Sequence, residues 1–251
     1  MGKVYLVGSG PGDPELVSLK AYRLINEADV ILVDRLVLGV KDLISKGKQV
    51  IDIGKTSSEH KFSQDAINAL LVELSEKYEK VVRLKGGDPY IFGRGGEEAT
   101  FLREKGVEFE VVPGITSASA VPALFSIPLT YRGVSSSVTI ITGHEMEEKE
   151  EELDWSALAH LKGTLVILMG VGTLGKNVEK LLKNGMPADT PVAIIEKGFT
   201  EDARIVCGTL GNIVEVVEKE EVKPPAVIVI GDVVRIREKL ILHSTRKGGE
   251  K

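Results

Sequence analysis

Residues Val81–Glu98 read VVRLKGGDPYIFGRGGEE and contain the pattern that decides the fold. A short apolar run ends in Gly86, Gly87 and Asp88, and three more glycines follow within ten residues. Glycines this dense after a strand allow positive φ and let the backbone approach a ligand closely. The stretch therefore predicts a strand followed by a ligand-binding loop. A Gly-rich surface turn is the alternative, and a single loop of this kind would favour it.

Other predicted strands end in loops of the same character, and predicted helices separate them along the chain. This alternation is typical of an α/β protein with a mostly parallel sheet. In such sheets ligands bind beyond the carboxyl ends of the strands. Four further segments occupy that position: GSGPGD at 8–13, Asp34, Gly54-Lys55, and GITS at 114–117. We therefore expect the site at this edge of the sheet.

The periodicity breaks around Pro122–Arg132, where two prolines interrupt an apolar segment. A second series of strands and helices follows the break. We predict two α/β domains with mostly parallel sheets, an N-terminal one over residues 1–118 and a C-terminal one over 119–243. The polar, Gly-rich segment 244–251 is expected to be a disordered tail.

Composition excludes several classes of function. The formal net charge of the 251 residues is -5, which gives no global field for nucleic acid. No apolar run approaches the ~20 residues that a membrane helix needs. The single cysteine and the absence of a signal-like N-terminus favour the cytoplasm. Four scattered histidines and that cysteine show no metal-ligand spacing, so we expect no metal.

Charged residues at the predicted edge suggest two kinds of chemistry. Asp34 and Lys55 each end a strand, so they could transfer protons or simply form an ion pair. Arg83, Arg94 and Arg132 are candidates for binding carboxylates, because a guanidinium matches a carboxylate in geometry. The GSGPGD loop at 8–13 has neither the dinucleotide fingerprint nor the Gly-Lys-Ser/Thr ending of a phosphate loop. A neutral or cationic nucleoside therefore suits this edge better than a polyphosphate.

The loops taken together resemble the tetrapyrrole (corrin/porphyrin) methyltransferase family. Matching segments span nearly the whole chain in family order: VGSGPGDPELVSLKA, VDRLV, RLKGGDPYIFGRGGEE, VPGITSASAVPALFSIPLT, RGVSSSVTIITGH, LDW, LMGVGTL and PPAVIVIGDVV. The resemblance implies that S-adenosylmethionine binds between two α/β domains and leaves as S-adenosylhomocysteine. It implies cofactor contacts, largely through backbone, at Pro11, Gly86, Gly87, Asp88, Ile91, Thr116, Ser117, Met169, Gly198, Pro225 and Ala226.

The resemblance also implies the reaction. Methyl groups would pass to ring carbons C2 and C7 of uroporphyrinogen III, giving precorrin-2 via precorrin-1 for sirohaem or cobalamin synthesis. It assigns Asp34 as proton acceptor and Lys55 as proton donor. The eight carboxylates of that substrate need cations, for which the best candidates are Arg35, Arg83, Arg94 and Arg132. A homodimer is implied as well.

Three alternatives stay open on the sequence. A sister methyltransferase acting on a later precorrin would share the cofactor loops, although the RLKGGDPYIFGRGGEE and TGH segments weigh against it. A non-catalytic protein that binds S-adenosylmethionine would not need Asp34 and Lys55. A generic nucleotide-phosphate enzyme would need the missing Lys-Ser/Thr ending.

Overall fold

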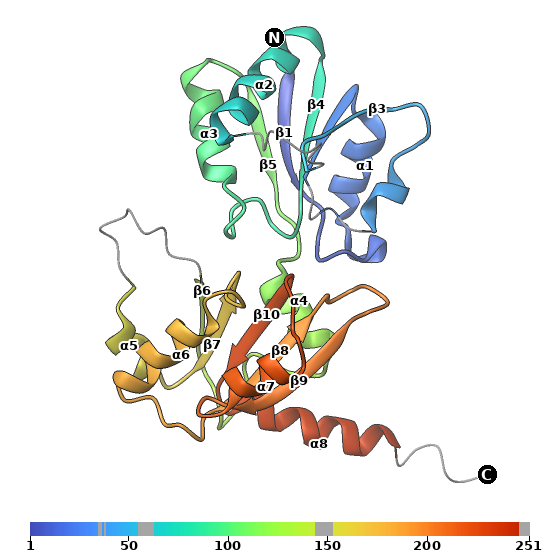
Figure 1. Ribbon diagram of the computed structural model, residues 1–251. Helices are drawn as coiled ribbons and strands as arrows, with labels where there is room; N and C mark the ends of the chain where they lie inside the picture. Colours follow the sequence, from blue (N-terminus) through green and yellow to red (C-terminus); the bar gives the residue numbers. More distant parts are fainter. Residues whose placement is uncertain (35–36, 38, 55–62, 144–152, 246–251) are drawn as a thin grey trace, which may run out of the picture. The chain divides into compact units, whose positions relative to one another are not determined.

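The computed structural model describes residues 1–34, 37, 39–54, 63–143 and 153–245. The chain forms two compact units, Met1–Thr116 and Ser117–Lys251, called unit 1 and unit 2 below (Figure 1). Most of the predicted tail lies outside the described residues. Its first two residues, Ser244 and Thr245, are the last residues of a helix.

Unit 1 contains a five-stranded sheet in which every strand pair is parallel. The strand order is β3-β2-β4-β1-β5. The strands are β1 (Lys3–Gly8), β2 (Val30–Val33), β3 (Gln49–Asp52), β4 (Lys80–Lys85) and β5 (Phe109–Val112). Because they are parallel, their carboxyl ends share one edge, as the sequence predicts.

Helices cover both faces of the unit 1 sheet. Helix α1 (Leu19–Glu27) packs on one face, and α2 (Gln64–Lys77) and α3 (Gly95–Glu104) pack on the other. Short 3-10 turns lie at Pro14–Leu16 and Val40–Leu43. Ser18 and Ser63 cap α1 and α2 by accepting a hydrogen bond from a backbone N–H of the first turn. Two apolar layers therefore fix the sheet from either side.

Unit 2 contains a mixed sheet in the order β6-β7-β10-β8-β9. The strands are β6 (Val138–Thr142), β7 (Thr164–Leu168), β8 (Pro191–Glu196), β9 (Arg204–Thr209) and β10 (Ala226–Ile230). Only the β6–β7 pair is parallel, while β10 runs antiparallel to both β7 and β8, and β9 to β8. The α/β class is confirmed, but this second sheet departs from the mostly parallel arrangement that we expected.

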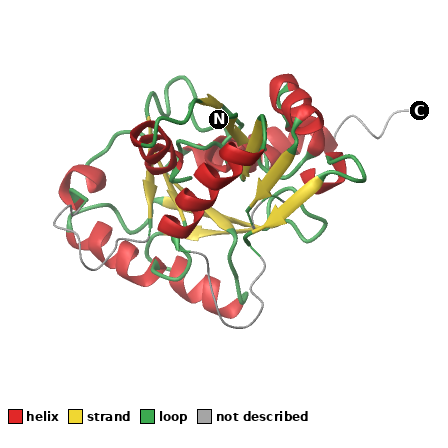
Figure 2. Cartoon of the chain, turned by 90° about the horizontal axis from the view of Figure 1, so that it is seen from above, coloured by secondary structure: helices red, strands yellow, loops and turns green. Residues whose placement is uncertain are grey.

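Helices again cover both faces of the unit 2 sheet. Figure 2 colours the helices of the chain red and its strands yellow. One face packs against α5 (Trp155–Ala159), α6 (Leu174–Lys183) and α7 (Ile213–Lys219). The other packs against α4 (Ser117–Leu124) and α8 (Val233–Thr245). The carboxyl ends of β6, β7 and β8 share an edge with the start of β10, because β10 runs in the opposite direction.

Candidate functional site

In unit 1, the loops that follow three adjacent strands are joined through their backbones. Gly10 and Gly87 form an antiparallel bridge, with N···O distances of 3.2 and 2.8 Å. A Cβ added at Gly114 would lie 2.2 Å from the carbonyl oxygen of Gly87 and 2.8 Å from the Cα of Gly8. Backbone this close leaves no space for a side chain, so the glycines permit the loops to converge.

Asp88 ties this junction together instead of pointing into solvent as an unpaired charge. Its Oδ1 accepts from the Tyr90 N–H at 2.8 Å and its Oδ2 from the Gly114 N–H at 3.0 Å. Pro11 and Thr116 belong to two of the same loops, and Ile91 follows Asp88 with 39% of its surface exposed. The structure thus brings together the predicted cofactor residues of unit 1.

In unit 2, the remaining predicted cofactor residues gather at one edge of the sheet. Met169 directly follows β7, and its neighbour Leu168 pairs with Val227 of β10. Ala226 pairs with Glu196, and the Lys197 N–H donates to the Pro225 carbonyl at 2.8 Å. The antiparallel course of β10 therefore places Pro225 and Ala226 beside Met169.

Helix α4 contacts the same edge. A Cβ added at Gly198 would lie 2.7 Å from a methyl group of Val121, one turn along from Ser117. Only glycine lets the loop after β8 approach the helix so closely. Ser117, Gly198 and the β10 start thus form one neighbourhood within unit 2.

Non-glycine residues with a positive φ concentrate in these loops, and the sequence does not predict them. Seven non-glycine residues among those described have a positive φ, and five of them lie at the predicted site. These five are Phe92, Arg94, Met169, Lys197 and Phe199. Such conformations cost of order 1–3 kcal/mol each and cluster at ligand-binding positions.

Beneath the unit 1 edge lies a group of buried charges. Arg83 and Lys85 of β4 are 1% and 3% exposed, and Glu98 of α3 is fully buried. Glu98 Oε1 accepts from Arg83 Nε at 3.2 Å and from Lys85 Nζ at 2.8 Å, and Arg83 Nη2 lies 3.1 Å from Asp34 Oδ2. Burial and neighbouring Arg83 lower the pKa of Lys85, against the opposing effect of Glu98.

The amino-acid sequence matches the Tetrapyrrole (Corrin/Porphyrin) Methylases over residues 3–214, which is most of the chain. The chain belongs to the tetrapyrrole methylase family. Both units contribute to the match, so the fold class and the predicted resemblance are confirmed together.

Individual tetrapyrrole methylases resemble the chain over nearly its full length. An S-adenosyl-L-methionine-dependent uroporphyrinogen III methyltransferase of Methanosarcina barkeri is 54% identical, covering 98% of this chain and 97% of that protein. A siroheme synthase of Pseudoalteromonas atlantica is 47% identical over 95% of this chain, which spans 52% of that longer protein. A solved structure also matches with a TM-score of 0.80: that of uroporphyrin-III C-methyl transferase from Thermus thermophilus complexed with S-adenosylhomocysteine. The two sequences are 42% identical, and the match covers 94% of this chain and 100% of that one.

Two predicted arginines of this tetrapyrrole methylase lie apart from the buried charges. Arg94 is 57% exposed in its side chain and pairs with Glu97 at 2.6 Å, and that hydrogen bond raises the pKa of Arg94. Arg132 is exposed in a turn before β6, where the Tyr131 N–H donates to the Ser135 carbonyl at 3.0 Å. That turn lies at the opposite end of β6 from its carboxyl edge. Arg35 and Lys55 lie outside the described residues.

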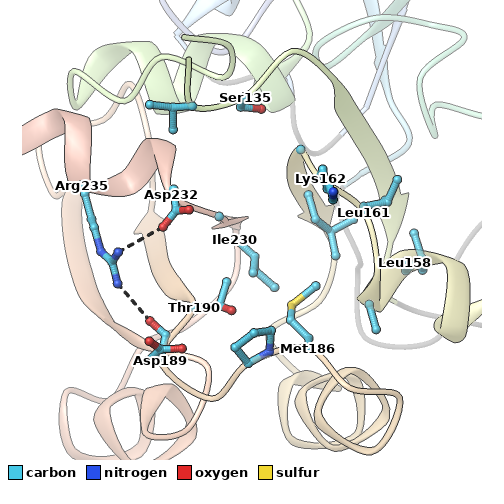
Figure 3. Close-up of a pocket in the computed structure, with 16 residues that line it drawn as sticks. Ser135, Leu158, Leu161, Lys162, Met186, Asp189, Thr190, Ile230, Asp232 and Arg235 are labelled. Atoms are coloured by element: carbon cyan, nitrogen blue, oxygen red, sulfur yellow. Dashed lines mark hydrogen bonds and ion pairs between the residues drawn. The ribbon is translucent and has the colours of Figure 1, made fainter. Parts of the chain in front are cut away.

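A cavity of about 490 Å³ opens at the far edge of the unit 2 sheet (Figure 3). Its lining includes Gly163 before β7, Thr190 before β8 and Gly231 after β10, so it lies at the strand ends opposite Met169 and Gly198. Arg235 lines the cavity; it forms an ion pair with Asp232 at 3.2 Å and donates a hydrogen bond to the Asp189 carbonyl at 3.3 Å. Of the described residues that line it, none is a predicted site residue.

Two further observations bound the chemistry of the described part of the chain. No group of three or more His, Cys, Asp and Glu side chains there is arranged to hold a metal ion. Likewise, none of the helices described above has the length and apolar character needed to cross a bilayer.

Proposed function

We propose that the chain transfers methyl groups from S-adenosylmethionine to ring carbons C2 and C7 of uroporphyrinogen III. Precorrin-2 is formed via precorrin-1, and S-adenosylhomocysteine is released. The observation that carries this proposal is the 54% identity, over nearly the full length of both chains, to a uroporphyrinogen III methyltransferase that depends on S-adenosylmethionine. The cofactor-bound relative at 42% identity supports the same assignment.

The residues of both edges fit the proposed cofactor. Convergent glycine loops at Gly86 and Gly87 present bare backbone, which suits recognition of a nucleoside through main-chain groups. We propose that the contacts come from Pro11, Gly86, Gly87, Asp88, Ile91 and Thr116 in unit 1, and from Ser117, Met169, Gly198, Pro225 and Ala226 in unit 2. When bound, S-adenosylmethionine supplies an electrophilic methyl group.

The chain's own residues would then position the substrate and handle protons. Asp34 is proposed to accept the proton that the methylated adduct loses, and Lys55 to donate one. Arg35 and Arg94 are proposed to bind substrate carboxylates, since a guanidinium pairs with them bidentately. Arg132 stays a predicted contact for which unit 2 gives no support, because its turn lies away from the cofactor edge.

Assembly and location complete the proposal. We propose a cytoplasmic homodimer whose product feeds sirohaem or cobalamin synthesis. The half-length match to siroheme synthases supports the first of these routes. Light scattering on the purified protein checks the dimer, and a monomer mass at micromolar concentration would contradict it.

The experiment is an anaerobic incubation of the protein with S-adenosylmethionine and freshly reduced uroporphyrinogen III, followed by product mass. We expect a gain of two methyl groups. Asp34→Asn is the matched variant, and it should bind the cofactor normally in calorimetry while methylating more slowly. Absence of any methylated product from the wild type would overturn the substrate assignment.

A second substrate has one specific observation in its favour. Cobalt precorrin-4 methyltransferase matches the structure with a TM-score of 0.80 at 27% identity over 92% of this chain. If the protein binds S-adenosylmethionine but leaves uroporphyrinogen III unmethylated, a later precorrin becomes the substrate to test.

A further inference from the structure

Strand alternation places two cations where the core of unit 1 should be apolar. Val30 and Leu32 of β2 and Val81 of β4 point into the layer covered by α2 and α3. Because side chains alternate along a strand, Asp34, Arg83 and Lys85 fall on the same face. Arg83 and Lys85 are nonetheless almost completely buried there. Buried charges are costly unless they are paired, so their retention calls for a reason.

Glu98 is the centre of this group, which we call the buried charge cluster (Arg83, Lys85 and Glu98). Its Oε1 accepts from both cations and from Gln64 Nε2 at 3.3 Å. Its Oε2 is buried and has no hydrogen-bond donor among the described residues. Glu98 lies in the first turn of α3, where the helix dipole favours a carboxylate. The helix thus anchors the cluster.

Among the described residues, a second carboxylate, that of Asp34, contacts the cluster. Two cations face one carboxylate inside the cluster, and the second carboxylate is Asp34, bound to Arg83 Nη2 at 3.1 Å. The Asp34 side chain is 43% exposed, whereas that of Arg83 is 2% exposed. Arg83 therefore reaches from the interior to a carboxylate at the surface edge, and is itself too buried to meet a substrate carboxylate.

We propose that Arg83 is a positioning residue that holds Asp34 in place for proton transfer, with Glu98 and Lys85 fixing Arg83 from beneath. This rests on the proposed function, since it assigns Asp34 the proton. Arg83 thereby takes a role different from the direct substrate contact that the sequence suggests. The guanidinium is suited to it because one fork contacts both Glu98 and Asp34.

The test is a double-mutant cycle built from wild type, Arg83→Met, Asp34→Asn and the double variant. We expect Arg83→Met to lower kcat at least about ten-fold, with the KM for uroporphyrinogen III and the Kd for S-adenosylmethionine unchanged. In the Asp34→Asn background, Arg83→Met should lower kcat less than about two-fold, because the carboxylate that Arg83 holds is no longer there. Arg83→Lys, which keeps a cation, should recover part of kcat.

Two controls separate positioning from general damage. Lys80→Met removes another cation of β4 whose ion pair, with Glu27 at 2.8 Å, lies at the start of the strand, so kcat should not change. Leu71→Ala weakens the same apolar layer without touching the cluster, and should lower the Tm while leaving kcat intact below it. Multiplicative losses in the cycle, or a rise in KM at constant kcat, would overturn the proposal.

The cycle has a second readout that needs no substrate. The Tm losses of Arg83→Met and Asp34→Asn should sum to more than the loss in the double variant, because the two changes remove one interaction. Additive Tm losses would contradict the Arg83–Asp34 coupling even if the wild type methylates well. Conversely, an inactive wild type with coupled Tm losses would count against the proposed substrate and not against the coupling.

Discussion

Met169 shows at the residue scale how stability and binding separate at this site. It has a φ of 56° and is 56% exposed directly after β7, so it contributes little to the core. We predict that Met169→Ala changes the free energy of unfolding by less than about 0.5 kcal/mol, as for other exposed side chains. The affinity of the Met169→Ala variant for S-adenosylmethionine, measured by calorimetry, should fall about ten-fold. This corresponds to a loss of about 1.4 kcal/mol in binding free energy. Leu240→Ala, at a comparably exposed position on α8, should change neither, and unaltered cofactor affinity in Met169→Ala would show that the Met169 side chain does not contact the cofactor.

Single residues also show where sequence reasoning stops. The glycines and Asp88 could be found because their spacing after strands is visible in the sequence. The burial of Arg83 and Lys85 was accessible in principle, since both lie at inward positions of an alternating strand. Glu98 could not be recognised as their partner, because a loop separates it from β4 and only the packing of α3 brings it over the strand. The positive φ of Met169 has no sequence signature, because it depends on the loop around it.

At the scale of elements, the convergence of the unit 1 loops makes a sharp prediction about glycines. Gly114→Ala would press a Cβ against backbone atoms of Gly87 and Gly8, which cannot rotate away. We expect a loss of about 1–3 kcal/mol in the free energy of unfolding, as for other overpacked sites. Cofactor affinity should fall as well, because the loops must separate. The measurement is chemical denaturation together with calorimetric titration.

Gly96→Ala is the matched control for this prediction. Gly96 lies in α3, its φ is not positive, and nothing lies within 4 Å of an added Cβ. Alanine is the better helix former, so this variant should gain up to about 1 kcal/mol. A similar loss in both variants would show that the loop convergence is not what makes Gly114 sensitive.

The elements themselves were predictable to a different degree in the two units. Unit 1 repeats strand and helix with a regular rhythm, which predicts a parallel sheet, and the structure has one. In unit 2 the short connection from β8 to β9 forms an antiparallel pair, and β10 then enters between β7 and β8 in the reverse direction. The apolar run of β10 is compatible with either direction, so its sequence could not reveal the choice.

At the scale of the whole molecule, each unit carries its own core on both faces of its sheet. The proposed cofactor contacts nevertheless come from residues of both units. Binding to the native state alone stabilises it by RT ln(1 + [L]/Kd), about 2.7 kcal/mol at 100 times Kd. If one cofactor molecule engages both sets of loops, this stabilisation should extend to both units.

Hydrogen exchange with and without saturating S-adenosylmethionine tests this directly. We predict slower exchange at the 86–91 loop of unit 1 and also around Met169 and Gly198 of unit 2. The strands around the cavity near Arg235 should be the internal reference, because that cavity lies at the opposite edge of its sheet from Met169. Protection confined to one unit would mean that the loops of the other do not contact the cofactor, because a ligand slows exchange through the contacts it makes. The cofactor contacts proposed for that unit would then be wrong.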